Sequence, residues 1–302
     1  MFMTETPSQR CGFIAIMGAP NAGKSTLLNR FVGQKISIVS PRVQTTRTRV
    51  LGIWMKNEVQ LVFIDTPGVF DAKKEFEKNM VQNAWQGQQG VDVTIVLVDC
   101  SRAKSIEETM LIIKKLGKKT PVVCVLNKID LIERGKLLEL AQKLWDKKIF
   151  EQVFMISAAE GDGVDKLVEY LMEQAPEQPW HFPSDQVSDL SLRLLAAEIT
   201  REQLFRQLHE EIPHESVVKP ETWQEKPNGE FIVHQIIYVL REGQKAIIIG
   251  ENGTKIRSIR QSAQRRMEEL LQAKVHLYIK VEVYPKWRED KKLLALVGFT
   301  SV

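Results

Sequence analysis

Two glycine-rich stretches hold residues whose types and spacing could do chemistry. The first, GAPNAGKST at residues 18–26, contains the pattern G-x-x-x-x-G-K-[ST] between an apolar run and a helical segment. Glycines let backbone N–H groups come close to a phosphate, and the start of the following helix attracts the anion. Lys24 is expected to reach the β- and γ-phosphates, and Ser25 to bind Mg²⁺. The alternative is a plain glycine turn, which the complete motif in this context argues against.

Three shorter motifs follow, each at the end of a strand-like apolar run. They are DTPG (65–68), NKID (127–130) and SAA (157–159). Asp65 is expected to hold Mg²⁺ through water, and the backbone N–H of Gly68 to meet the γ-phosphate. Ligands of open α/β sheets bind at the carboxyl ends of the strands, so the three motifs are expected at one site.

Asp130 is the residue expected to select the base. Its carboxylate can accept two hydrogen bonds from the N1–H and 2-amino groups of guanine, which adenine does not offer in that arrangement. An unpaired carboxylate against adenine costs free energy, so the pattern predicts GTP rather than ATP. The Ala158 N–H is expected to meet the guanine carbonyl oxygen. The predicted nucleotide-binding residues are Gly18, Ala19, Pro20, Asn21, Ala22, Gly23, Lys24, Ser25, Thr26, Asp65, Thr66, Pro67, Gly68, Val69, Asn127, Lys128, Ile129, Asp130, Ser157, Ala158 and Ala159.

The second glycine-rich stretch, GENG at 250–253, lacks the spacing of a phosphate loop and matches the GxxG loop of KH domains. In those domains the loop clamps the backbone of about four single-stranded nucleotides. From 244 to 292 the chain has twelve Lys/Arg against six Asp/Glu, within a total net charge of only +4, which favours a nucleic-acid partner. The alternative is an ordinary turn beside a solvated basic face. The predicted RNA-binding residues are Gly250, Glu251, Asn252, Gly253, Thr254, Lys255, Arg257 and Arg260.

These motifs lie in two differently patterned halves of the chain. The first half alternates buried-type strands with amphipathic helical stretches such as 105–118 and 134–148, which predicts a doubly wound α/β domain with a mostly parallel sheet. Its strongest predicted strands are 12–18, 59–65, 93–99, 121–127 and 152–157. Three prolines interrupt the pattern at 174–185, where we place a linker. The predicted domains are a leader at 1–10, a nucleotide domain at 11–177, a linker at 178–188 and an RNA-binding domain at 189–302.

The second half has the element order of an α+β domain. A helix at 189–208 precedes two extended segments at 215–226 and 230–242, which a turn at PNG joins, and a long helix to about Gln272 precedes a strand at 274–285. One stretch is ambiguous, because QKAIII (244–249) is β-branched like a strand although a KH domain requires a helix there. We follow the resemblance and predict a helix.

Composition excludes several classes of protein. With 43% hydrophobic and 26% charged residues, the chain is ordinary for a soluble globular protein, and its longest apolar runs are too short to cross a bilayer. The start has no signal-peptide pattern, so we expect a cytoplasmic protein. Three single cysteines suggest buried reduced thiols, and five histidines show no zinc-ligand spacing.

The ordered nucleotide motifs resemble those of the translation-factor class of small GTPases. That resemblance places switch I at QTTR (44–47), with Thr46 as the hydroxyl that completes the Mg²⁺ shell and Thr45 as the competing candidate. It places switch II at 68–85, where Val69 stands in place of the glutamine that orients water in Ras-like members and cannot do so itself. In the branch that this chain resembles, the position of Asn21 coordinates K⁺. The expected catalytic residues are therefore Asn21, Lys24 and Thr46, and the expected metal ligands are Ser25, Thr46 and Asp65.

The K⁺ expectation has a structural alternative, in which Asn21 only caps the turn. Otherwise, K⁺ held by Asn21 and the loop at 35–44 helps to neutralise charge in the transition state.

The combination of this GTPase pattern with a C-terminal KH pattern resembles the Era family of bacterial GTPases over nearly the whole chain. The resemblance implies a P-loop GTPase domain followed by a type II KH domain, with GTP/GDP, Mg²⁺ and K⁺ as cofactors. It implies binding to small-subunit ribosomal RNA near its 3′ end, a role in 30S subunit maturation, and a monomer in the cytoplasm with some peripheral membrane association. Two alternatives remain: a tRNA-modifying GTPase of the same branch, which would lack the GxxG domain, and an RNA-binding scaffold in which GTP is structural.

Overall fold

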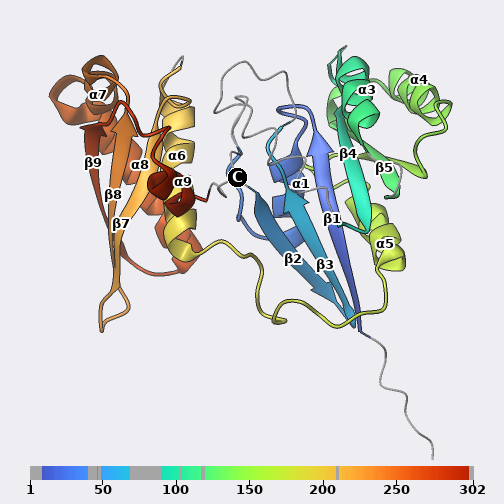
Figure 1. Ribbon diagram of the computed structural model, residues 1–302, viewed down its shortest axis with the longest axis horizontal. Coiled ribbons are helices and arrows are strands. Elements are labelled where there is room, and N and C mark those ends of the chain that lie inside the picture. The colour runs from blue at the N-terminus through green and yellow to red at the C-terminus, as the bar shows by residue number, and fades with distance from the viewer. Residues whose placement is uncertain are drawn as a thin grey trace, which may run out of the picture. The chain divides into compact units, whose positions relative to one another are not determined.

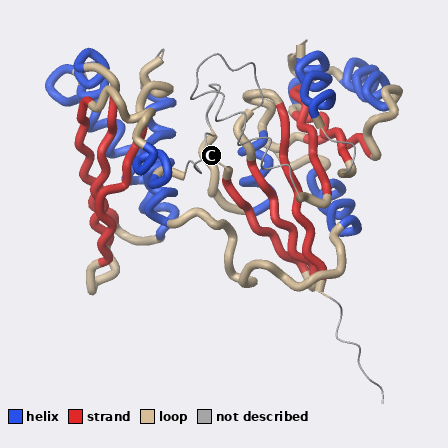
Figure 2. Tube along the Cα trace, viewed as in Figure 1, coloured by secondary structure: helices blue, strands red, loops and turns tan. Residues whose placement is uncertain are grey.

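The computed structural model describes residues 9–39, 46, 49–68, 90–102, 104–116, 120–208 and 211–298. These residues form two compact units. The first contains the described residues up to Ile36 and from Arg49 to Asp189, and the second contains the described residues within Ser37–Thr48 and those from Leu190 onward. Figure 1 traces both units, and Figure 2 distinguishes their helices from their strands. None of the helices in the described ranges is long and apolar enough to cross a membrane.

The first unit is built on a six-stranded sheet in the order β2-β3-β1-β4-β5-β6. Every pair is parallel except β2–β3, which confirms the mostly parallel sheet. Each strand predicted from the sequence is present, and the bounds of β3 and β4 agree with the prediction to the residue. The strands are β1 (Arg10–Gly18), β2 (Val50–Lys56), β3 (Val59–Asp65), β4 (Val93–Asp99), β5 (Val122–Asn127) and β6 (Gln152–Ile156).

The edge strand β2 was not among the strands predicted from the sequence. It forms a hairpin with β3 through the two-residue turn at Asn57 and Glu58, where Asn57 takes a positive φ of 53°. A glycine in the middle of β2 weakens its strand signal. Gly52 is needed there, because a Cβ on it would lie 2.5 Å from Leu28 Cδ1 and 2.8 Å from Val32 Cγ2 of the neighbouring helix.

Helices cover both faces of this sheet. One face packs against α1 and α5, and the other packs against α3 and α4. The structure confirms the helices predicted at 105–118 and 134–148, although both end earlier than predicted. The helices are α1 (Lys24–Val32), α3 (Ser105–Lys115), the short 3-10 turn η1 (Ile129–Leu131), α4 (Arg134–Trp145) and α5 (Val164–Gln174).

The second unit has a three-stranded sheet in the order β7-β8-β9, with β7–β8 antiparallel and β8–β9 parallel. Helices α6 and α8 pack against one face of this sheet, as Figures 1 and 2 show. The element order confirms the predicted KH arrangement, to which the short helix α9 is an addition. The elements are α6 (Leu192–Gln207), β7 (Val217–Glu225), β8 (Phe231–Val239), α7 (Glu242–Ile249), η2 (Glu251–Gly253), α8 (Thr254–Leu271), β9 (Val275–Val283) and α9 (Lys291–Leu296).

Helix α7 settles the ambiguity at residues 244–249 in favour of a helix. The Gln244 side chain accepts hydrogen bonds from the backbone N–H groups of Leu240 and Arg241 at 2.9 and 3.2 Å. These bonds satisfy donors at the start of the helix, which local β-propensity ignores. Ile248 is then buried in the core of the second unit.

A valine at position 52 should destabilise the first unit. For Gly52→Val we expect the free energy of unfolding to fall by about 1–3 kcal/mol, because the added side chain forces α1 away from β2. Urea unfolding followed by circular dichroism measures the change. Gly135→Val in α4 is the control, since a Cβ there meets nothing within 4 Å. Equal unfolding midpoints for the two variants would contradict this account of the packing.

Candidate functional site

The phosphate-loop residues lie between β1 and α1, where the sequence motif places them. Gly23 precedes α1 with a φ of 100°, and a Cβ on it would lie 2.3 Å from Nδ2 of Asn127. Only glycine fits this position, both for its backbone conformation and for the close approach. Asn21 also has a positive φ, of 64°, a conformation that asparagine tolerates better than most residues. DTPG lies beside this loop, because a Cβ on Gly68 would be 2.9 Å from the backbone of Pro20.

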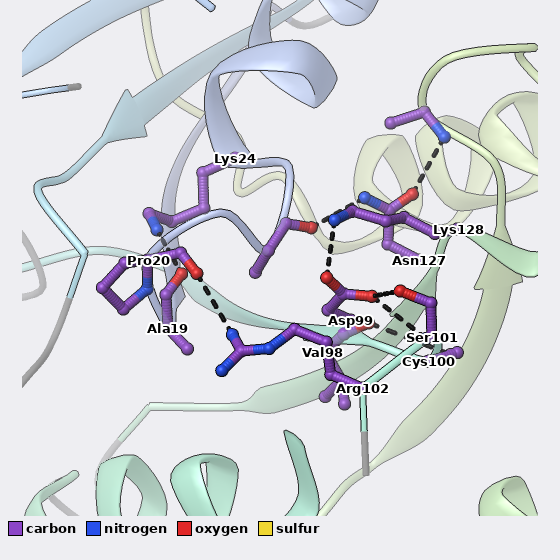
Figure 3. A network of polar contacts seen from close by, with 12 residues as sticks. Ala19, Pro20, Lys24, Val98, Asp99, Cys100, Ser101, Arg102, Asn127 and Lys128 are labelled. Carbon is purple, nitrogen blue, oxygen red and sulfur yellow. Dashed lines mark hydrogen bonds and ion pairs between the residues drawn. The ribbon is translucent and has the colours of Figure 1, made fainter. Parts of the chain in front are cut away.

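Lys24 is buried at the start of α1 and folds back over the loop. Its Nζ donates hydrogen bonds to the carbonyl oxygens of Gly18 and Ala19 at 3.1 and 2.9 Å (Figure 3). Burial lowers the pKa of Lys24 to about 8, although the nearby Asp65 carboxylate opposes this shift. A phosphate bound at the loop would add negative charge beside Lys24 and stabilise the charged form of its side chain.

Two oxygen ligands suited to Mg²⁺ are already together. The Ser25 hydroxyl donates to Asp65 Oδ2 at 2.7 Å, and the Asp65 carboxylate is fully buried at the end of β3. Hydroxyl and carboxylate oxygens are the donors that Mg²⁺ prefers. The pair therefore fits the predicted metal site. Thr46 is described and buried, whereas Thr45 lies outside the described residues, so the choice between them stays a prediction.

Asn127 joins three of the predicted motifs. Its Nδ2 donates to the carbonyl oxygen of Ala22 in the phosphate loop at 2.8 Å, and its Oδ1 accepts from the Ala158 N–H at 2.9 Å. The Ala158 N–H was expected to meet the guanine carbonyl oxygen, which must therefore compete with Asn127 for this proton. Both bonds are buried, and Figure 3 shows Asn127 between the loop and the neighbouring strand ends.

Lys128 is held by an acid that the sequence analysis did not select. Its Nζ lies 2.5 Å from Asp99 Oδ2, and Asp99 Oδ1 accepts from the Ser101 backbone N–H at 3.0 Å and from the Ser101 hydroxyl (Figure 3). Burial raises the pKa of the Asp99 carboxyl, but the bonds from Lys128 and Ser101 outweigh it and hold the pKa below its ordinary value. Asp99 ends β4 as Asp65 ends β3, which is the signal that could have identified it.

The NKID and SAA motifs end adjacent strands. Asp130 is exposed in η1 beyond β5, and Ser157 and Ala158 are buried beyond β6. Arg30 of α1 donates from Nε to the Ala158 carbonyl oxygen at 3.2 Å and also bonds the Ala159 carbonyl oxygen. Arg30 is thus a second positioning residue that the motifs did not reveal.

The GENG loop connects α7 to α8 and is exposed. Asn252 and Gly253 have positive φ angles of 50° and 72°, and a Cβ on Gly253 would meet nothing within 4 Å. The space beside Gly253 is therefore open, whereas a Cβ on Gly250 would lie 2.7 Å from Lys255 Cβ. Lys255 and Arg257 are exposed on the first turn of α8, and Arg260 is half-buried one turn later.

Some predicted positions lie outside the described residues. They are Val69, most of switch II, and the part of switch I around Thr46, together with residues 40–44 of the loop expected beside K⁺. The roles assigned to them stay predictions.

The chain matches known families in both units. A family model described as 50S ribosome-binding GTPase matches residues 13–128, and a KH domain model matches residues 211–288. GTPase Era of Erythrobacter litoralis is 42% identical over 99% of this chain and 100% of its own length. GTPase Era of Afipia carboxidovorans is 45% identical over 96% of this chain and 94% of its own.

Two solved structures are similar over both units. A crystal structure of Era in complex with MgGDPNP and nucleotides 1506–1542 of 16S ribosomal RNA has a TM-score of 0.89, at 37% identity over 97% of this chain and 100% of that chain. A single-residue variant of Era from Aquifex aeolicus bound to GDP.AlF4⁻ also has a TM-score of 0.89, at 36% identity and with the same coverage.

Nucleotide binding should take up a proton above pH 8. The lowered pKa leaves Lys24 largely neutral at pH 8.5, and a bound diphosphate should raise this pKa and return the charge. We expect GDP to take up as much as about one proton at pH 8.5 and much less at pH 7, from a pKa of about 8.

Isothermal titration calorimetry in two buffers of different ionisation enthalpy measures the proton uptake. The binding enthalpy should differ between the buffers at pH 8.5 and nearly coincide at pH 7. Coincidence at both pH values would show that Lys24 stays charged without nucleotide.

Proposed function

The chain belongs to the Era family of GTPases, and from this membership we propose that it binds small-subunit ribosomal RNA and assists maturation of the 30S subunit. One observation carries the proposal. A nucleotide site with its motifs assembled and an exposed GxxG loop on a basic helix occur in the same chain. The solved Era complex, which holds both a GTP analogue and 16S ribosomal RNA, supports this pairing of ligands.

The nucleotide site is proposed to work by positioning and charge neutralisation. Backbone N–H groups of the loop and Lys24 hold the phosphates, and Ser25 and Asp65 hold Mg²⁺, which supplies charge neutralisation at the phosphates. Asp130, which is exposed beyond β5, is proposed to accept the hydrogen bonds of guanine. Because Asn127 and Arg30 fix the loops around that place, the site would be formed before the nucleotide arrives.

We propose that K⁺ assists hydrolysis at Asn21. The support is the place of Asn21 in the predicted phosphate loop, three residues before α1 begins at Lys24. Its positive φ equally suits a residue that only shapes the turn, so the side chain's role needs a direct test. Val69 cannot orient water by hydrogen bonding, which leaves charge neutralisation as the means of acceleration.

The RNA site is proposed to lie along α7, the GENG loop and the start of α8. Glycines let a sugar-phosphate backbone come close, and Lys255, Arg257 and Arg260 are placed to meet phosphates. Ile247 of α7 is 53% exposed beside this loop, which offers an apolar surface to unpaired bases. The family description that matches the first unit names the 50S subunit, but the solved Era complex contains 16S RNA, and we propose the small subunit.

The remaining proposals rest on the resemblance to the family. We propose a monomer that acts in the cytoplasm and associates in part with the inner face of the membrane, and that binds the RNA near its 3′ end.

GTP hydrolysis should be faster in potassium than in sodium buffer, by on the order of tenfold if K⁺ neutralises charge in the transition state. Multiple-turnover phosphate release, with and without ribosomal RNA, measures this. Asn21→Gly keeps the positive φ but removes the side-chain oxygen, so it should bind GTP and lose the potassium effect. Equal rates of the unmodified protein in the two salts would remove the K⁺ proposal.

An aspartate in the GENG loop should weaken RNA binding selectively. For Gly253→Asp we expect at least about a tenfold loss of affinity for a single-stranded 16S 3′-end RNA, because a carboxylate then occupies the open space where phosphates approach. GTP affinity should not change.

Gly229→Asp is the matched control for this prediction. It adds the same charge at a φ of 77°, also with nothing within 4 Å, but in the β7–β8 turn. Fluorescence anisotropy with labelled RNA measures all three proteins. Equal losses in both variants, or none in Gly253→Asp, would refute the placement of RNA at this loop.

A further inference from the structure

Residues 178–188, expected to be a linker, are attached to the first unit at two places, together with Asp189. The first is Gln60, a fully buried residue of β3. Its Oε1 accepts from the backbone N–H groups of His181 and Phe182 at 2.9 and 3.1 Å, and its Nε2 donates to the Phe182 carbonyl oxygen at 2.8 Å. The His181 ring packs edge-on against Phe13, with 5.0 Å between ring centroids. One buried amide thus holds two consecutive residues of the segment.

The second attachment is at the outer edge of β2. The Ile53 N–H donates to the Val187 carbonyl oxygen at 2.9 Å. Leu51 is held on both sides, because its N–H donates to Asp189 Oδ1 at 3.0 Å and its carbonyl oxygen accepts from the Ser188 hydroxyl at 2.7 Å. These are the backbone groups of an edge strand that point away from its partner β3, so the segment takes the place of a further strand.

The second unit begins at the residue directly after these bonds. Leu190 packs against the core that contains Leu195 and Ile199. Ser191 caps α6, where its hydroxyl accepts from the Leu194 N–H at 3.4 Å. Asp189 therefore belongs to the first unit by its hydrogen bond, and Leu190 belongs to the second by its packing. If one unit reorients relative to the other while the bonds to β2 stay closed, we expect this segment to rotate about the backbone between Asp189 and Leu190.

Strand β2 is also the strand nearest to the nucleotide-sensing part of the chain. It begins at Val50, three residues after the segment expected as switch I, and Val50 pairs in register with Asp65, the proposed Mg²⁺ ligand. Leu51, which holds both Ser188 and Asp189, is the next residue. If switch I shifted and moved the start of β2, the displacement would be transmitted to Asp189 through Leu51 alone.

We propose that Val187, Ser188 and Asp189 with the outer edge of β2 form a latch, which places the pivot between the two units at Asp189–Leu190 and transmits the nucleotide state to it. The proposal rests on the proposed function, in which one chain binds both a guanine nucleotide and RNA. The latch bonds lie at a solvent-accessible edge, where Val187 is 37% exposed, and such bonds can open and close more readily than buried ones. Gln60, which is buried, would remain attached in both states.

Distance measurements between spin labels test the latch without RNA. Lys166→Cys and Gln261→Cys place one label on an exposed position of each unit, and the native cysteines are buried. With the latch intact we expect a narrow distance distribution whose mean differs between GDP and a GTP analogue. In Ser188→Ala/Asp189→Ala the distribution should broaden at least about twofold and its mean should no longer depend on the nucleotide.

Two control variants separate the latch from general damage. Asp189→Asn keeps an oxygen that can accept from Leu51, and should retain the narrow distribution. Asp185→Ala removes a carboxylate from the same segment at an exposed position and should behave like the unmodified protein. Thermal melting checks that every variant is folded.

Each outcome decides the proposal. A distribution that stays narrow in the double variant, or that broadens but keeps its nucleotide-dependent shift, overturns it, and so does a distribution without such a shift in the unmodified protein. RNA affinity, measured in the GDP and GTP-analogue states, separates this inference from the proposed function. If RNA binds in neither state, the proposed function fails while the distance measurements still decide the latch.

Discussion

The side-chain amide of Asn127 holds the nucleotide site together. It donates to the phosphate loop at Ala22 and accepts from the loop after β6 at Ala158, so one buried residue sets the spacing between the part that binds phosphate and the part that surrounds the base. The phosphates and the base of a nucleotide are joined through one ribose, so they can span only a limited distance, and the two parts of the site must lie within it. The contact also requires glycine at position 23, since Asn127 Nδ2 occupies the space of a side chain there. Two motifs 104 residues apart are thereby constrained by one contact.

The two units are proposed to bind anions in different ways. In the first, Lys24 and Asp65 are buried, and burial lowers the pKa of Lys24. In the second, the GENG loop and its lysine and arginine neighbours are exposed and hydrated. The first arrangement suits a small ligand that is enclosed. The second suits a long, flexible polymer whose phosphates are met one after another.

The connection that we propose between the two sites depends on hydrogen bonds along the outer edge of β2. The edge strand β2 starts beside Asp65 and binds Ser188 and Asp189 along its free edge. An uncovered edge would invite pairing with another chain, so the same segment that connects the units also protects the sheet. Both consequences follow from the short polar side chains of Ser188 and Asp189 and the carbonyl oxygen of Val187, which bond to the outer edge of β2.

The sequence alone predicted most of the fold and the motifs from which both sites are proposed. The spacing of Gly18, Gly23, Lys24 and Ser25, the strand-ending motifs and the buried strands of the parallel sheet are local patterns, and local patterns survive folding unchanged. For the helix at 244–249, β-branching pointed the wrong way, and only the resemblance to KH domains predicted it. The helix is capped locally, because the Gln244 side chain accepts from the N–H groups of residues 240 and 241.

The tertiary structure alone decided which distant residues meet. Asp99 with Lys128, Arg30 with Ala158, and Gln60 with Phe182 are pairs whose members are separated by 29 to 128 residues. Although Asp99 stands at the end of a strand and Lys128 lies in a motif, no spacing in the sequence indicates which residue pairs with which. They meet because the order of strands in the sheet brings particular ends and edges together, and that order is a property of the packed core as a whole.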